Sequence, residues 1–371
     1  GRRTLDEEAF NSRANYLAAD IGSSSSDEGA SIRLRSLSRA DVLQPALKLV
    51  NQSLTEPRFD AEVFRRRQNQ SVTALQQNET DPAFVADRAA TLLDYPDHPY
   101  GSSARTSEQS LRAVTLADIR AFHRSRYGKN NAIVAVVGDI DRRQTEALVQ
   151  TVLAGLPAKS SRSAAVPPVP ERNAQRRDMP FDAEQAQSVM SMPLIRRDDP
   201  DYYALVVGNY ILGSGGFDGR LMKTLRDQYG YTYGAYSNLA PATEAGAFSI
   251  AFSTQKANAA PALAAAQKVL ADFVAEGPTE AELQQAKSNL VGGFPLRFDT
   301  NAKLLQYLSL IGFYNLPDDY LEAYPKAVAA ISSAQIKAAW QRRVQPQNMN
   351  IVVVGGEAPH TSDAHQKSAS F

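Results

Sequence analysis

The sequence predicts an α+β protein made of two similar domains, in which sheets are covered by helices. Three observations lead to this prediction. The chain has 371 residues, 43% of them hydrophobic, which is enough for two cores. A helix followed by a strand occurs near the end of each half. Within both halves, strand-like alternation is mixed with helix-like apolar stripes.

The repeated unit covers residues 115–139 and 332–356, which align at a constant offset of 217 positions. Each copy reads as a helix followed by a buried β-branched strand that ends at glycine. The matched pairs are Ile119 with Ile336, Asn131 with Asn348, Val136 with Val353, Val137 with Val354, and Gly138 with Gly355. Such a repeat indicates two domains that arose by duplication.

The domain boundary is predicted at residues 156–180, a stretch rich in Pro, Ser, Ala and Arg with no apolar period. This composition is typical of an exposed linker. We therefore expect an N-terminal domain over 1–155, a C-terminal domain over 181–357, and a polar tail over 358–371.

In the first half, residues 30–37 alternate as a strand with one wetter face. A helix follows, with Asp41 and Gln44 expected to form its capping box and Pro45 in its first turn. A second helix is predicted from about Asp60 toward Gln77, and "NETDP" ends it.

In the second half, residues 187–194 and 246–254 are predicted strands and 199–212 a predicted helix. Residues 279–290 form another helix, with Thr279 and Glu282 as its capping box.

Composition excludes several classes of function. Lys plus Arg equals Asp plus Glu at 40 each, so no overall field favours nucleic acid or an anionic membrane. The absence of cysteine excludes disulfides, thiolate nucleophiles and cysteine zinc sites. No apolar run approaches the roughly 20 residues of a membrane span.

The histidines do not form a metal site by spacing. We expect His98 at the surface after a turn, and His123 at a packing position opposite its repeat partner Trp340. His360 and His365 lie in the polar tail, and a spacing of five does not hold two ligands on one helix face.

The stretch "LRDQYGYTYGAYS" (225–237) concentrates an arginine, tyrosines and glycines. Residues 219–229 are predicted to be a helix that ends at Gly230, followed by a strand with Tyr231, Tyr233 and Ala235 on one side. In a purely structural interpretation, Arg226 in the last helical turn interacts favourably with the helix dipole, and the tyrosines pack within a sheet. The alternative is that Arg226 and Tyr233 converge on a peptide carbonyl, the tyrosine donating to a developing oxyanion.

The run "GSGGFDGR" (213–220) matches neither the dinucleotide-binding nor the P-loop pattern and follows a helix, so it favours a turn between helices.

The longer stretch "NYILGSGGFDGRLMKTLRDQYGYTYGAYSNL" resembles the C-terminal domain signature of the pitrilysin, or insulinase-like, zinc peptidases. The resemblance extends over nearly the whole chain, including "DHPYG" and "NNAIVAVVGDI". It implies two homologous α+β domains with mainly antiparallel sheets that face each other across a cavity. It also implies that Arg226 and Tyr233 bind the substrate backbone, with Gly215 and Gly216 lining the bound peptide.

This sequence departs from the family's pattern at the zinc ligands. In that family, zinc is held by H-x-x-E-H and by a glutamate one helix later. No H-x-x-E-H occurs in the chain, and we expect the corresponding helix upstream of Gly1, with the first domain incomplete there. Alignment on "NETDP" places the family's paired glutamates at Thr73 and Ala74, which do not suit that role. Glu79, the nearest carboxylate, is expected beyond the helix end.

The resemblance therefore implies a non-catalytic subunit of a heterodimeric bacterial peptidase, inactive alone, with zinc in a homologous partner subunit. Extended peptide would bind by strand addition. Two alternatives stay open: an assembly subunit like the core proteins of respiratory complexes, and an independent zinc peptidase whose motif lies upstream. The resemblance favours the periplasm, and the sequence leaves the compartment open.

Overall fold

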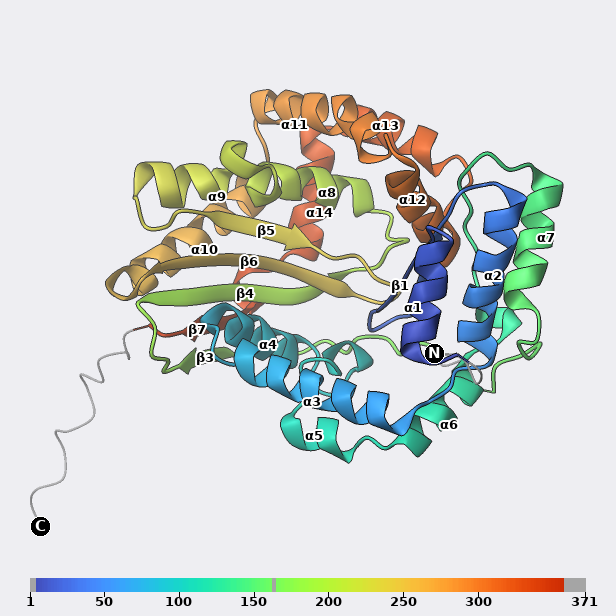
Figure 1. Ribbon diagram of the computed structural model, residues 1–371. Helices are drawn as coiled ribbons and strands as arrows, with labels where there is room; N and C mark the ends of the chain where they lie inside the picture. Colours follow the sequence, from blue (N-terminus) through green and yellow to red (C-terminus); the bar gives the residue numbers. More distant parts are fainter. Residues whose placement is uncertain (1–4, 162–164, 357–371) are drawn as a thin grey trace, which may run out of the picture.

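The computed structural model of the chain describes residues 5–161 and 165–356. The predicted tail over 358–371, with His360 and His365, lies outside the described residues. The C-terminal half is built on a five-stranded sheet, and the N-terminal half is largely helical with a two-stranded sheet (Figure 1). The α+β class is thus confirmed. No helix in the described ranges is long and apolar enough to cross a membrane.

In the N-terminal half, strands β1 (Asp20–Ser25) and β2 (Ala30–Arg35) form an antiparallel hairpin. The predicted strand at 30–37 is therefore confirmed. The helices of this half are α1 (Glu7–Tyr16), α2 (Ala40–Thr55), α3 (Ala61–Asn78), α4 (Pro82–Asp94), α5 (Glu108–Ala113), α6 (Leu116–Arg126) and α7 (Arg142–Leu153).

The C-terminal sheet has the strand order β3-β7-β4-β6-β5, with β5 and β3 at its edges. Adjacent strands in this sheet pair antiparallel, except that β3 and β7 are parallel. The strands are β3 (Arg176–Met179), β4 (Gln185–Ile195), β5 (Ala235–Leu239), β6 (Gly246–Gln255) and β7 (Asn350–Val354). Because β3 lies within 156–180, the end of that predicted linker is a strand and not a free connection.

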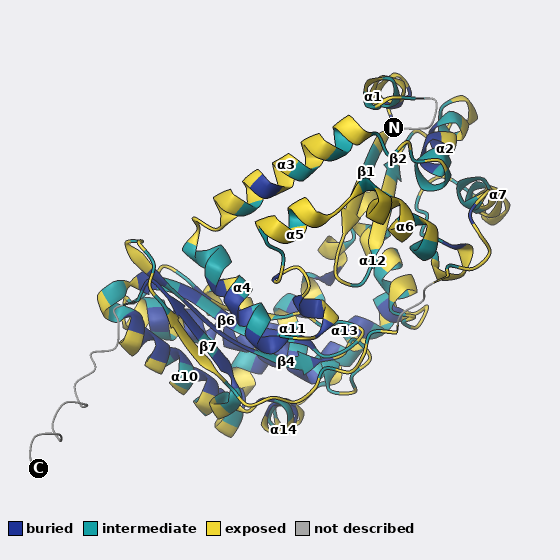
Figure 2. Cartoon of the chain, turned by 90° about the horizontal axis from the view of Figure 1, so that it is seen from below, coloured by how far each residue is buried: buried dark blue, intermediate teal, exposed yellow. Residues whose placement is uncertain are grey.

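One face of this sheet is covered by helices whose apolar sides meet the alternate residues of β4 and β6. The helices of this layer are α8 (Tyr202–Asn209), α9 (Arg220–Met222), α10 (Ala259–Glu276) and α14 (Ser333–Arg343). Helices α11 (Glu280–Gly292) and α13 (Tyr320–Ala330) pack against α8, and α12 (Asn301–Phe313) has no buried residue. Figure 2 shows buried residues concentrated in this half, whereas α3 is mostly exposed. The main core of the described chain therefore belongs to the C-terminal half.

The repeat is confirmed in its helices but not in its strands. Helices α6 and α14 begin and end at equivalent positions, each behind a capping box, with Thr115 and Ser332 as N-caps. Residues 350–354 form β7, but residues 132–137 are in no strand, so the predicted first copy of the strand is wrong. The reason is that no neighbouring strand pairs with this segment within the described residues, and Ile133 is consequently 52% exposed.

The two halves contact each other through α4, which packs on the sheet face opposite the main helical layer. Its Ala86, Ala90 and Leu93 meet Val189 of β4 and Val352 of β7. At the end of α4, the Asn350 side-chain amide donates to buried Asp94 over 2.7 Å.

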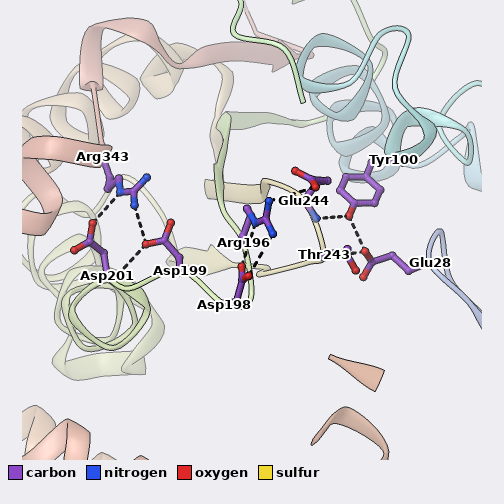
Figure 3. Close-up of polar contacts among 9 residues, drawn as sticks. All are labelled: Glu28, Tyr100, Arg196, Asp198, Asp199, Asp201, Thr243, Glu244 and Arg343. Carbon is purple, nitrogen blue, oxygen red and sulfur yellow. Dashed lines mark hydrogen bonds and ion pairs between the residues drawn. The ribbon is translucent and has the colours of Figure 1, made fainter. Parts of the chain in front are cut away.

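A second connection runs through Glu28, in the β1–β2 turn. Its carboxylate accepts from the Tyr100 hydroxyl at 2.6 Å, the Thr243 amide at 2.9 Å and the Tyr314 hydroxyl at 2.7 Å. Burial raises the pKa of Glu28, but these hydrogen bonds outweigh it and hold the pKa below its usual range. Figure 3 shows Glu28 and Tyr100 meeting the Thr243–Glu244 turn. This carboxylate thus joins residues from both halves.

Two predicted helix starts have opposite outcomes. Thr279 and Glu282 form the predicted capping box of α11. Asp41 does not cap α2, because its carboxylate binds the Arg39 guanidinium, and Pro45 lies inside the helix instead of in its first turn.

The surface position predicted for His98 is wrong. The ring is buried, with Nε2 2.7 Å from the Pro167 carbonyl and Nδ1 accepting from the Tyr100 amide. Its two hydrogen bonds and its contact with the Tyr100 ring explain why this histidine is inside.

Candidate functional site

Arg226 lies in a π-helical turn, Lys223–Gln228, that continues α9. The predicted helix over 219–229 is confirmed in outline, since Leu221 and Leu225 are fully buried and Gly230 ends it with a positive φ of 63°. The guanidinium lies 4.9 Å from the centre of the Phe217 ring. No carboxylate pairs with it among the described residues, so its N–H groups remain available to an external acceptor.

Tyr233 projects from a short turn held by hydroxyl groups. Thr232 is buried, and its Oγ1 accepts from the Gly234 amide at 3.0 Å and donates to the Gly234 carbonyl. Thr254 donates to the Tyr231 carbonyl on the other side of the turn. Tyr233 itself is 87% exposed, and its hydroxyl has no partner within the described chain.

The strand expected from Tyr231 begins only at Ala235. Tyr233 and Ala235 therefore do not share a side: the first is exposed and the second is fully buried. The Thr232 turn breaks the alternation, since its hydroxyl replaces strand hydrogen bonds with local ones. This change directs Tyr233 outward.

The glycine run lies between two π-helical turns, Tyr210–Ser214 and Lys223–Gln228. Gly216 has a φ of 69°, a region that favours glycine. A Cβ at Gly215 would come within 2.7 Å of the Tyr210 carbonyl. The run thus forms the predicted turn between helices, and it places Phe217 over Arg226. Local π-turns occur often at functional sites.

Strand β5 follows Tyr233 and is an edge of the sheet, paired only with β6. Its Tyr236 side chain is half exposed. An edge strand offers unpaired backbone donors and acceptors to a further extended chain. Arg226, Tyr233 and the open edge of β5 are therefore close in the sequence and on connected elements, although Arg226 and Tyr233 make no direct contact in the described structure.

The residues at the expected third zinc-ligand position do not fit zinc. Thr73 and Ala74 are exposed on α3, and neither offers a carboxylate or imidazole. Glu79 is the C-cap residue of α3 and pairs with Arg88 at 2.6 Å. Across residues 5–161 and 165–356, no group of three or more His, Asp or Glu side chains is placed to hold a metal ion.

Chemically, this arrangement offers a cation and a neutral phenol as hydrogen-bond donors to peptide carbonyl oxygens. Sequence reasoning did not single out Phe217 or Thr232, which hold the two donors in place. A threonine two residues before glycine is a weak signal for such a turn, and the ring of Phe217 gives no signal of its own.

Comparison with known proteins shows which family the chain resembles. A family model described as the peptidase M16 inactive domain matches residues 113–290. The crystal structure of a peptidase M16 inactive domain from Pseudomonas fluorescens superposes with a TM-score of 0.92 at 34% identity. That match covers 96% of this chain and 85% of the other.

Curated relatives include both non-peptidase and zinc-protease proteins. A protein of Helicobacter pylori named a non-peptidase homolog is 23% identical over 96% of this chain and 82% of its own length. An uncharacterized zinc protease of Mycobacterium leprae is 30% identical, over 54% of this chain and 46% of its own length. The periplasmic protease PqqL of Escherichia coli shares the fold, with a TM-score of 0.78 at 18% identity, over 96% of this chain and 39% of its own.

Proposed function

This chain belongs to the M16, or pitrilysin-like, peptidase family as an inactive-domain member, and we propose that it is a peptide-binding subunit that completes the active site of a zinc-bearing homologous partner. The proposal rests on two observations taken together: hydrogen-bond donors are present, and suitable zinc ligands are missing from the expected third-ligand positions. The donors Arg226 and Tyr233 are built into the fold with no partner in the described chain, while the expected zinc-ligand positions are Thr73 and Ala74.

The peptide would lie extended along the free edge of β5, so that backbone hydrogen bonds give affinity without fixing its sequence. Arg226 and Tyr233 would then donate to its carbonyl oxygens. A donor aimed at a carbonyl gains strength as that oxygen becomes negative, so the same contact that binds the peptide also stabilises the transition state. In this role the chain orients and polarises the substrate, and the partner subunit supplies the zinc.

Peptide binding by the isolated full chain tests the first half of this proposal. The probe is a fluorescein-labelled, unstructured decapeptide, and its control is the same sequence N-methylated at alternate amides, which cannot pair with a strand edge. We expect Tyr233→Phe to weaken binding about fivefold and Arg226→Gln at least tenfold, since hydrogen bonds from charged groups are the stronger ones.

Two substitutions serve as matched controls for this titration. Tyr16 is 89% exposed on α1, in the other half of the molecule, so Tyr16→Phe controls for loss of an exposed phenol. Lys223→Gln removes an exposed charge from the turn that carries Arg226. Both should bind within twofold of the unaltered chain. If the Arg226 and Tyr233 variants bound the peptide as tightly as the unaltered chain, the proposed contacts would be refuted.

A further inference from the structure

The C-terminal half contains a cavity of about 460 Å³ that is lined by neither Arg226 nor Tyr233. It lies among α8, α11, α12 and α13, and this volume is in the range of small-ligand pockets. Its walls are largely aromatic, since five tyrosines and a phenylalanine line it, namely Tyr202, Tyr210, Tyr307, Tyr320, Tyr324 and Phe294. Two arginines line it, Arg197 and Arg297, and no carboxylate does.

Within the described residues Arg197 lacks a carboxylate partner, although acidic residues surround it in the sequence. Three carboxylates follow it closely in the chain, and each is taken by another arginine (Figure 3). Asp198 binds Arg196 at 3.1 Å, and Asp199 binds Arg343 at 2.8 Å. Asp201 binds both Arg343 and Arg342. Within the described residues, Arg197 has no carboxylate.

The surroundings of Arg197 fix it without neutralising it. The guanidinium lies 5.3 Å from the Tyr202 ring centre and 5.4 Å from that of Tyr314, and Nη1 donates to the Tyr202 hydroxyl. Its Nε is buried with no hydrogen-bond partner in the described chain. A buried donor without an acceptor is unfavourable, and an anion bound beside it would supply that acceptor.

The other groups in the cavity also suit an anion with an apolar body. Arg297 is exposed and forms no ion pair with any residue that the structure describes. Burial raises the pKa of Tyr324 to about 12 and also raises that of Tyr320, so both hydroxyls stay protonated and can donate. The rings provide a flat apolar surface beside the two cations.

The larger cavity, of about 660 Å³ in the N-terminal half, lacks this mismatch of charge. Its Glu7 already binds Arg67 at 3.2 Å, and its Asp60 accepts from two amides at the start of α3. Its charges therefore satisfy one another, whereas those of the smaller cavity do not.

We propose that the cavity lined by Arg197 and Arg297 binds a carboxylate carried on an aromatic or bulky apolar group. Two sources share this chemistry: a free aromatic acid and the C-terminus of a peptide that ends in an aromatic residue. The site involves neither Arg226 nor Tyr233 and needs no partner subunit, so it goes beyond the proposed function and can fail independently of it.

Calorimetric titration of the full chain tests the site with 3-phenylpropionate and its neutral analogue 3-phenylpropionamide. We expect the acid to bind at least tenfold more tightly than the amide. Arg197→Gln and Arg297→Gln should each remove most of that difference, and Arg197→Lys should keep part of it. Arg196→Gln is the matched control, because Arg196 already has carboxylate partners and should leave both affinities unchanged.

The peptide arm uses acetyl-Gly-Gly-Phe with a free carboxylate and with a carboxamide. Tighter binding of the free tripeptide than of 3-phenylpropionate would support the site and assign it to peptide C-termini, whereas binding of 3-phenylpropionate alone would assign it to free acids. Equal affinity of acid and amide, or no binding of any probe at millimolar concentration, would overturn the inference. Arg297 is exposed, so Arg297→Gln keeps the test valid if Arg197→Gln does not fold.

Discussion

Two arginines close together in the sequence have different surroundings: one is paired with a carboxylate, and the other, within the described residues, is not. Arg220 donates from Nε and Nη2 to Glu282, both over 2.7 Å, and its guanidinium lies over the Phe273 ring. Arg226 lies over Phe217 without a carboxylate in the described chain. The first arginine holds α9 to α11, and the second is available to bind.

Glu282→Gln should destabilise the protein by about 2 kcal/mol at pH 7, because it leaves the half-buried Arg220 unpaired. Burial raises the pKa of Glu282, but the hydrogen bonds from Arg220 and Thr279 outweigh it and lower the pKa to about 2 from an ordinary 4.5. Since the folded pKa is lowered, this stability is present above about pH 4.5 and is lost as the pH falls toward 2. Urea unfolding at pH 7 and pH 3 measures it.

The control for that experiment is Glu322→Gln, since Glu322 is an exposed acid in the first turn of α13 and forms no ion pair in the described structure. It should change stability by less than about 0.5 kcal/mol. A Glu282→Gln deficit that did not shrink between pH 7 and pH 3 would contradict the account.

At the scale of elements, α8 and α14 pack closely because α8 has a glycine where the Trp340 indole lies. A Cβ at Gly208 would come within 2.0 Å of the indole Nε1, and Trp340 is buried between Phe248 and Phe273. The rings meet edge to face, an arrangement that aromatic pairs favour. The tryptophan therefore depends on a residue without a side chain.

Gly208→Ala should cost about 2–3 kcal/mol through overpacking, despite the higher helix propensity of alanine. Trp340 is the chain's single tryptophan, so intrinsic fluorescence during denaturation follows this contact directly. Gly292→Ala is the matched control, because a Cβ there meets nothing within 4 Å. It should be neutral or stabilising by up to about 1 kcal/mol; equal effects of the two substitutions would disprove the packing argument.

Sequence patterns predicted these elements where local signals and tertiary contacts agree. The α11 capping box, the β4 and β6 strands and the two repeated helices needed only local rules. Residues 132–137 have strand composition but pair with nothing in the described chain, and a strand needs a neighbour. Likewise, Asp41 has the chemistry of a cap, but Arg39 competes for its carboxylate.

The candidate site was predictable only in part, for a similar reason. Arg226 and Tyr233 were found by resemblance to a family motif, and their role stays a prediction. The turn that directs Tyr233 outward depends on Thr254, which lies on another strand. Arg197 was not predicted at all, since three nearby carboxylates suggest pairing and only the folded chain shows that other arginines take them.

At the scale of the whole molecule, a buried acid lies where the two halves meet. Asp94, at the end of α4, is 4% exposed and accepts from Asn350 of β7. Burial raises its pKa to about 6 from an ordinary 3.8. Contact between the halves is therefore linked to pH.

Because the folded pKa of Asp94 is raised, its contribution to stability is fully present below about pH 4 and is lost as the pH rises through 6. Asp94→Asn mimics the protonated acid, so it should be about 2 kcal/mol more stable than the unaltered chain at pH 7.5 and nearly equal at pH 4. Chemical denaturation at both pH values measures the difference. Asp97→Asn, which removes an acid from an exposed surface pair, serves as the control; a similar profile for both variants would contradict the assignment.

The central claim is that this chain provides Arg226 and Tyr233 to a zinc-bearing homologue, and turnover by the reconstituted pair tests it most directly. The unaltered chain or its Tyr233→Phe variant is mixed with a homologous H-x-x-E-H subunit, and peptide cleavage and complex formation are measured together. The account predicts that the complex forms equally well while kcat falls about 100-fold or more, as for the loss of one oxyanion donor. An intact complex with unchanged turnover would contradict it and leave an assembly subunit as the role of this chain.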